Sequence, residues 1–168
     1  AVQSVLAQTC DDYEIIIVND GSTDGYTNAL LSKYDGQKIK VLHTANHGLP
    51  KARNNGIRAS TGRYILPLDA DDKICPEYLA EAIKVLDDDP ETGIVYGEVE
   101  YFGEKTGKWD LAPYSFEKTL RENQIFCSAF FRREDYDATS GYNPNMIHGW
   151  EDWDFWLLII ELGREVVK

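Results

Sequence analysis

The stretch that decides the fold is Gly62-Arg63-Tyr64-Ile65-Leu66-Pro67-Leu68-Asp69-Ala70-Asp71-Asp72. A mostly apolar strand, predicted over 63–68, leads directly into a group of aspartates. Alternate side chains of a strand point to the same side, so Asp69 and Asp71 are expected to converge on one point. Paired carboxylates at the carboxyl end of a strand are typical of a site for magnesium or manganese. The alternative is an acidic turn whose last aspartate caps the next helix, near Pro76 and Glu77.

The segments around this stretch alternate between strand and helix patterns. Helices are predicted over 1–8, 23–34, 49–60 and 76–88, and strands over 13–19, 39–43 and 63–68. This alternation indicates an α/β domain with a mostly parallel sheet and helices on both faces. After Pro90 the pattern predicts a hairpin from 94–101 and 108–111, a short helix over 115–122, a strand over 125–132 and a helix over 150–162.

The two ends read as those of a trimmed domain. A helical pattern is already under way at Ala1 without a start signal, and Arg164 to Lys168 has the pattern of a strand that has just begun. We therefore expect a single domain over 1–168 that is truncated at both ends. Membrane association is expected, if at all, only through segments outside this stretch.

Charge and cysteine content exclude several classes of partner. The net charge of −12 argues against nucleic acid and against an anionic membrane surface, because both are bound through dense lysine and arginine. A phosphorylated small ligand would need a bound cation beside it. Cys10, Cys75 and Cys127 are widely spaced and odd in number, which favours small core residues in a reducing compartment over disulfides or a zinc site. The predicted location is cytoplasmic, including the cytoplasmic face of a membrane.

The turn after the first predicted strand is Asn19-Asp20-Gly21-Ser22-Thr23-Asp24. Gly21 permits a tight turn, and a residue of Thr23-Asp24 is expected to cap the next helix. Asp20 would then lie beside a helix amino terminus, where it can accept hydrogen bonds from a nucleoside. The alternative is an ordinary strand-to-helix turn. The glycine-rich motifs of dinucleotide-binding and P-loop proteins are absent from the sequence.

A second polar segment runs from Asn46 through Gly48 to Gly56 and opens a helix. Arg53 lies about one turn into that helix and is expected to reach the same sheet edge as Asp20 and Asp69. The alternative for Arg53 is a solvated helix face.

The helix over 150–162 begins with acids among aromatic residues, Gly149-Trp150-Glu151-Asp152-Trp153-Asp154-Phe155-Trp156. Helical geometry predicts that Asp152 shares a face with Phe155 and Trp156. A carboxylate against apolar surface is a better base near neutral pH. The alternative is an acid that stabilises a helix amino terminus beside core aromatics.

Taken together, the segments around Asp20, Arg53 and Asp69-Ala70-Asp71 and the pair Glu151-Asp152 resemble the family 2 glycosyltransferases of the GT-A fold. This resemblance implies an inverting enzyme that moves a sugar from a nucleotide-sugar donor, most commonly a UDP-sugar, to a hydroxyl of a glycan or glycolipid acceptor, in polysaccharide or glycoconjugate synthesis. It also implies a nucleotide-binding half over 1–90, an acceptor-side half over 91–168, and a manganese or magnesium ion.

The resemblance also implies a role for each matching residue. Asp20 would hold the base, with Asn19 and Asn46 beside it, and Arg53 would orient the nucleotide. Asp69 would contact the ribose or the metal, and Asp71 would bind the metal. Asp152 would be the general base, and Glu151 would position the acceptor.

The sequence departs from the pattern of this family in two respects, and two other interpretations of it stay open. The first strand of the family's fold and the region after Lys168 are not in this sequence. A phosphate-receiver or phosphatase-like domain would also place aspartates at strand ends, but it would leave Trp150–Trp156 unexplained. A non-catalytic nucleotide- or carbohydrate-binding relative would keep the acids for structural reasons. The aromatic residues Trp109, Trp150 and Trp153 are candidates for stacking on acceptor sugars, and core packing is the alternative.

Overall fold

The computed structural model describes residues 1–34, 36 and 38–168 of the chain. The helices are α1 (Val2–Leu6), α2 (Gly25–Leu31), α3 (Leu49–Ala59), α4 (Tyr78–Asp88), α5 (Phe116–Thr119), α6 (Arg133–Asp137) and α7 (Glu151–Glu161). The strands are β1 (Ile15–Asp20), β2 (Ile39–Thr44), β3 (Tyr64–Ile65), β4 (Thr92–Val95), β5 (Val99–Tyr101), β6 (Gly107–Trp109), β7 (Phe130–Arg132) and β8 (Glu165–Val167).

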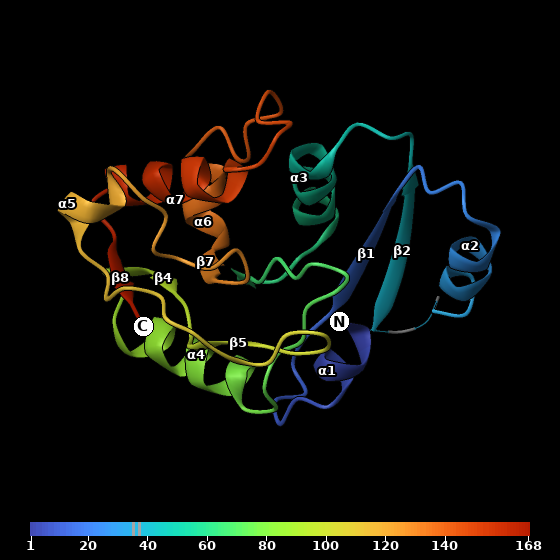
Figure 1. Cartoon of the computed structure of the whole chain (residues 1–168), viewed down its shortest axis with the longest axis horizontal. Coiled ribbons are helices and arrows are strands. Elements are labelled where there is room, and N and C mark those ends of the chain that lie inside the picture. The colour runs from blue at the N-terminus through green and yellow to red at the C-terminus, as the bar shows by residue number, and fades with distance from the viewer. Residues whose placement is uncertain (35, 37) are drawn as a thin grey trace.

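Strands β3, β7, β4 and β8 form a central layer with helices on both sides. Figure 1 shows α6 and α7 above strands β4, β7 and β8 and α4 below them, while β1 and β2 stand apart beside α3. The predicted α/β architecture with helices on both faces is therefore confirmed. None of the helices in the described part of the chain has both the length and the apolar character needed to cross a membrane.

The strands pair in three groups, which are β1-β2, β3-β7-β4-β8 and the hairpin β5-β6. Strands β1 and β2 are parallel, as are β4 and β8, whereas β7 runs antiparallel to both β3 and β4. Strand β7 comes late in the chain, yet it is inserted between two earlier strands. The two predicted halves of the chain therefore share one sheet.

Alternation along β4 and β7 divides the core into two layers. Ile94 pairs with Phe131 and Val95 with Phe130, and successive side chains of a strand point to opposite faces. Ile94 and Phe131 join the cluster beneath α7, which includes Trp156. Val95 and Phe130 join the cluster above α4. Because these residues are nearly inaccessible to solvent, this sheet is covered on both faces.

Several predicted boundaries differ from the structure. The strand expected over 63–68 ends at Ile65, because Pro67 has no N–H to donate to a strand ladder. The segment 94–101 divides between β4, which lies in the central sheet, and β5, which pairs with β6 in the expected hairpin. Helix α6 was not predicted, since five residues are too few for an apolar period to be visible.

Candidate functional site

The turn after β1 is held against the loop between β2 and α3 by Asp20. The Asp20 carboxylate accepts hydrogen bonds from Thr44 Oγ1 at 2.9 Å, from the His47 backbone N–H at 3.0 Å and from the Gly48 backbone N–H at 2.8 Å. Asp20 was predicted to lie beside the amino terminus of the next helix in the chain, α2, whereas these bonds place it at the amino end of α3 and give it a structural role in fixing the loop. Asn46 is exposed on the same loop.

Gly21 makes this loop approach possible. Its φ of +75° lies in the left-handed region, and a Cβ at this position would lie 2.6 Å from the backbone nitrogen of Asn46. A side chain here would therefore force the loop away from the turn. Asp24 caps α2 by accepting a hydrogen bond from the Thr27 backbone N–H at 2.7 Å, which confirms the predicted capping pair.

Asn19 uses its amide within this turn. The side chain is buried, its Nδ2 donates to Asn28 Oδ1 at 2.8 Å, and its Oδ1 accepts from the Ser22 backbone N–H at 2.9 Å. These bonds give Asn19 a structural function in shaping the turn that carries Asp20. A contact between Asn19 and a substrate stays a prediction.

The aspartates after β3 lie in a turn and not on a continuing strand. The Asp72 backbone N–H donates to the Asp69 carbonyl at 3.1 Å, so the strand alternation that was expected to bring Asp69 and Asp71 together does not apply. One ligand atom from each of Asp69, Asp72 and Cys127 lies within 4.8 Å of the others. Asp71 is exposed beside this group. The geometry thus favours Asp72 over Asp71 as the partner of Asp69, and a metal contact through Asp71 stays a prediction.

Burial and neighbouring charges raise the pKa values of Asp72 and Cys127. Burial raises the pKa of Asp72, and the neighbouring carboxylates of Asp69 and Asp71 raise it further. Burial also raises the pKa of the Cys127 thiol to about 12, with Asp69 adding to the effect. A divalent cation between these groups would remove the repulsion between the carboxylates, and carboxylate oxygens are ligands that magnesium and manganese prefer. The residues present therefore fit a hard cation.

Arg53 joins the two ends of the candidate site. Its guanidinium donates from Nη2 to Asp69 Oδ1 at 2.9 Å and from Nη1 to Glu151 Oε1 at 2.7 Å. The Arg53 side chain is only 7% exposed, so the alternative of a solvated helix face is wrong. Burial works against its charge, but Tyr142, Asp69 and Glu151 outweigh burial and hold the guanidinium pKa above its ordinary value.

The first turn of α7 separates Glu151 from Asp152. The buried face of the helix carries Glu151, Phe155, Trp156 and Ile159, because residues four positions apart share a face. The prediction placed Asp152 on that apolar face, whereas the structure leaves it half-buried at the edge. Asp152 Oδ2 there accepts a hydrogen bond from Asn123 Nδ2 at 3.0 Å. Glu151 is occupied by Arg53, and the Oδ1 atom of Asp152 has no partner among the hydrogen bonds of the described residues.

Sequence reasoning missed four residues of this site, namely Asp72, Asn123, Cys127 and Tyr142. Tyr142 is completely buried, and its ring lies 5.4 Å from the Arg53 guanidinium carbon. Burial raises the pKa of its hydroxyl. Only the run of aspartates that contains Asp72 gave a sequence signal, because a lone asparagine, cysteine or tyrosine has no local pattern that marks a site.

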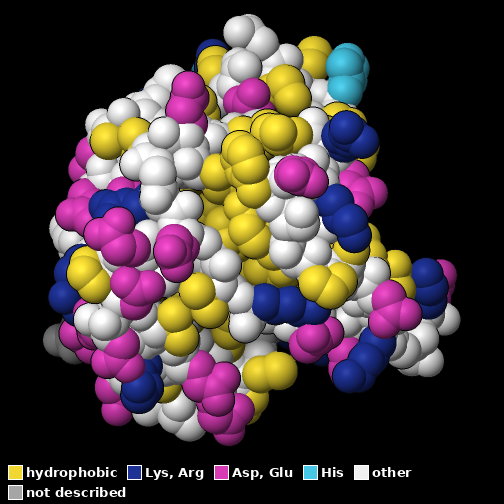
Figure 2. Space-filling view, turned by 90° about the vertical axis from the view of Figure 1, so that its left-hand side faces the viewer, with side chains coloured by type: hydrophobic (Ala, Val, Ile, Leu, Met, Phe, Trp, Pro, Cys, Tyr) yellow, Lys and Arg dark blue, Asp and Glu magenta, His cyan; other side chains and the backbone are white. Residues whose placement is uncertain are grey.

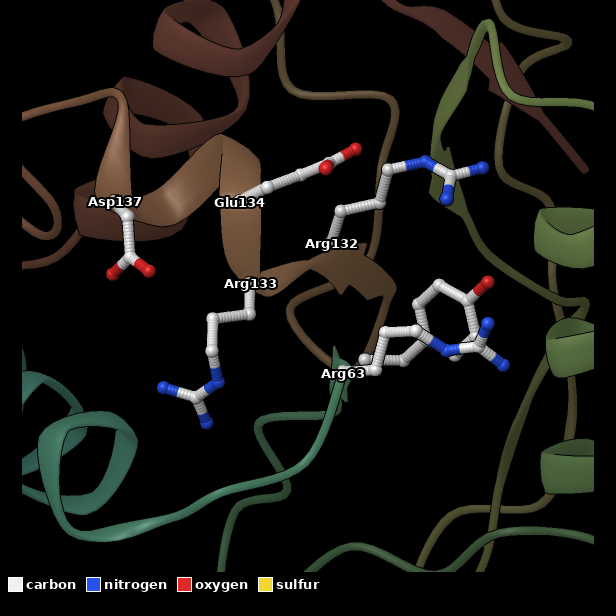
Figure 3. Close-up of a pocket in the computed structure, with 6 residues that line it drawn as sticks. Arg63, Arg132, Arg133, Glu134 and Asp137 are labelled. Carbon is white, nitrogen blue, oxygen red and sulfur yellow. The ribbon is translucent and has the colours of Figure 1, made fainter.

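A separate cavity of about 300 Å³ is lined by arginines. Figure 3 shows Arg63, Arg132 and Arg133 around it, together with Glu134 and Asp137 of α6. Arg133 donates to the carbonyls of Ile57 and Gly62, and Arg132 donates to those of Leu86, Asp89 and Thr92. The carbonyls of Ile57, Leu86 and Asp89 lie at the carboxyl ends of α3 and α4, so these guanidinium groups have a structural function there. None of the predicted site residues lines this cavity.

Solved structures share this fold. The mannosyltransferase PcManGT from Pyrobaculum calidifontis, in complex with GDP-Man and Mn²⁺, superposes with a TM-score of 0.74 at 22% identity, over 99% of this chain and 49% of that one. The S. aureus protein TarS, residues 1–349, in complex with UDP-GlcNAc, superposes with a TM-score of 0.73 at 20% identity, over 99% of this chain and 50% of that one. The predicted GT-A fold is therefore confirmed.

Curated relatives are similar over part of their length. The putative glycosyltransferase EpsH of Bacillus subtilis is 38% identical over 109 residues, which are 64% of this chain and 31% of EpsH. The uncharacterised glycosyltransferase YibD of Escherichia coli is 42% identical over 78 residues, 45% of this chain and 22% of YibD. The chain thus matches about a third or less of the length of these relatives. The family model described as Glycosyl transferase family 2 matches residues 1–144, and the chain belongs to this family.

Proposed function

We propose that this chain carries the donor and acceptor site of an inverting glycosyltransferase that moves a sugar from a nucleoside-diphosphate sugar to an acceptor hydroxyl. The observation that carries the proposal is the double ion pair of Arg53, which brings Asp69 after β3 and Glu151 at the start of α7 to one place. Solved structures of the same fold hold GDP-Man with Mn²⁺ and UDP-GlcNAc, which supports a nucleotide-sugar donor.

On the donor side, we assign nucleotide recognition to the turn after β1 and to Arg53. Asp20 is positioned at the amino end of α3, where its carboxylate is the candidate acceptor for a base N–H, with Asn46 exposed on the adjoining loop. Arg53 is the candidate for orienting the nucleotide through its contact with Asp69. Binding measurements with different nucleotide sugars would identify the base that this site recognises and the sugar that it transfers.

Asp69 and Asp72 would hold the divalent cation, with Asp71 and Cys127 beside them. A bound cation would supply neutralisation of the diphosphate, which a sugar diphosphate needs in order to leave. The chain's own contribution is to orient Asp69, whose Oδ1 is fixed by Arg53.

On the acceptor side, we assign the general base to Asp152. Glu151 is buried and paired with Arg53, so its carboxylate is occupied and it acts by positioning. Asp152 is held through Oδ2 by Asn123, and its Oδ1 is the atom that accepts the proton of the attacking hydroxyl. A base opposite a leaving diphosphate gives a single displacement, and hence inversion at the anomeric carbon.

The test compares Asp152→Asn with Glu151→Gln in the whole enzyme, with UDP- and GDP-sugars and Mn²⁺. Asp152→Asn should lower kcat roughly 10²–10⁴-fold, the span for a positioned base, with donor affinity by calorimetry unchanged. Glu151→Gln should act mainly on acceptor KM and on stability. Tyr26→Ala, at an exposed position on α2, is the control. If the wild type binds nucleotide diphosphates but transfers no sugar, the protein is a non-catalytic relative and the proposal is wrong.

A further inference from the structure

Trp150 combines an exposed side chain with an unfavourable backbone conformation. Its side chain is 61% exposed, although tryptophan normally gains from burial. Its φ of 67° and ψ of 9° place it in the left-handed region, and it is the one non-glycine residue with positive φ in the part of the chain that the structure describes. Neither burial nor backbone preference explains a tryptophan here, and strained residues of this kind concentrate at binding and catalytic sites.

The Trp150 ring is supported on one side and open on the other. Its centroid lies 5.8 Å from that of Trp153, with the two rings inclined at 66°. Trp153 is itself anchored, because its Nε1 donates to the Thr119 carbonyl at the end of α5 at 2.7 Å. The Trp150 carbonyl accepts the Asp154 backbone N–H at 3.0 Å, which fixes the residue as the start of α7. The indole is therefore held in place while most of its surface faces solvent.

The same short segment also orients the candidate base. Asn123, four residues after Thr119, donates to Asp152, which is two residues after Trp150. Thr119 and Asn123 thus connect the segment after α5 to both the tryptophan pair and the carboxylate. Trp150 and Asp152 share one rigid frame, in which a ring lying on the indole would be close to the start of α7.

We propose that the exposed face of Trp150 stacks against an uncharged sugar ring of the acceptor, so that the site selects a neutral glycan. This inference rests on the proposed function. The C–H face of a pyranose is apolar and flat enough to cover an indole, which gives a rigid contact with little loss of side-chain entropy. We infer a neutral ring from the charge of the helix that carries the indole: Glu151, Asp152 and Asp154 occupy the first turn of α7, which has no basic residue, and these acids disfavour an anionic sugar. Figure 2 shows Asp and Glu side chains over much of one face of the molecule, with Lys and Arg side chains between them.

The test measures binding of methyl glycosides of glucose, galactose, mannose and N-acetylglucosamine by saturation-transfer NMR and by tryptophan fluorescence, with glucose 6-phosphate as the anionic comparison. At least one neutral glycoside should bind through its ring C–H protons and more tightly than glucose 6-phosphate. Trp150→Phe should retain the contact, whereas Trp150→Ala and Trp150→Gly should weaken binding at least about tenfold, since base or sugar stacking on an aromatic ring is lost with the ring.

Trp150→Gly separates binding from structure. Glycine accepts the left-handed conformation without strain, so this variant should keep or raise the melting temperature while it loses the glycoside. Tyr26→Ala again removes an exposed aromatic side chain at another site and should bind the glycosides as the wild type does.

Two results overturn the inference: glycoside binding that is equal in wild type and Trp150→Gly or absent from both, and a wild-type dimer that Trp150→Gly converts to a monomer in ultracentrifugation. If donor binding with Mn²⁺ is intact in these experiments, only the acceptor inference fails, whereas absent donor binding contradicts the proposed function itself.

Discussion

Replacing Arg53 by Met removes the guanidinium that contacts both Asp69 and Glu151, and it should destabilise the protein strongly. The two carboxylates differ in how far water can replace the lost ion pair. The Glu151 side chain is 8% exposed, so water cannot replace the ion pair, whereas Asp69 is 32% exposed and can be hydrated.

The size of the effect follows from this difference. Removing one partner of a buried ion pair costs about 3–5 kcal/mol, because the other charge is left without compensation. The partly exposed pair with Asp69 adds at most about 1 kcal/mol. In a protein of this size, 1 kcal/mol changes the melting temperature by roughly 2–4 °C, so the loss should be clearly visible in thermal unfolding. Arg53→Met combined with Glu151→Leu should recover most of the loss, because no buried charge remains.

The assay is urea unfolding followed by tryptophan fluorescence, with Arg58→Met as the matched control. Arg58 lies on the same helix and is exposed, so its replacement should change the free energy of unfolding by no more than about 0.5 kcal/mol. A loss below about 1 kcal/mol for Arg53→Met would contradict the reasoning, as would a double variant no more stable than Arg53→Met alone.

Two further predictions concern the segments that position the site. Burial works to raise the pKa of Glu14, but hydrogen bonds from Thr61 and Gly62 outweigh it and hold the pKa below the ordinary 4.5. The resulting stabilisation is present above pH 4.5 and is lost as the pH falls through the folded-state pKa of Glu14. Between pH 7 and pH 3 the melting temperature should therefore fall less for Glu14→Gln than for the wild type. Identical melting curves for the two proteins would refute this. Gly21→Ala should cost about 1–3 kcal/mol in urea unfolding, since φ is +75° and the new Cβ would meet the Asn46 backbone. Gly25→Ala, where a Cβ meets nothing within 4 Å, is its control, and equal stability of the two variants would disprove the argument.

Local patterns in the sequence were enough to predict the order and type of most elements. The apolar run at Ile15–Val18 forms β1, and the periodic apolar residues of 76–88 form α4. Asp24 caps α2 as a residue of its type and position should. These features depend on backbone dihedrals, capping and periodicity, which act between residues close in the chain. The same patterns predicted that Asp20, Arg53 and Asp69 lie near the ends of strands and helices.

Only the tertiary structure decided how these parts meet. Arg53 and Glu151 are 98 positions apart, and no spacing rule relates them. The insertion of β7 between β3 and β4 places Cys127 beside Asp69 and Asp72. Because residues 69–72 form a turn, Asp72 and not Asp71 lies in this group of possible metal ligands. Such contacts depend on strand order and on which helix face is buried, and both are set by burial over the whole chain. The sequence by itself determined the elements and the residue types of the site, whereas long-range packing decided that Arg53 pairs with Asp69 and Glu151 and that Asp152 lies at the edge of the buried face beside Asn123.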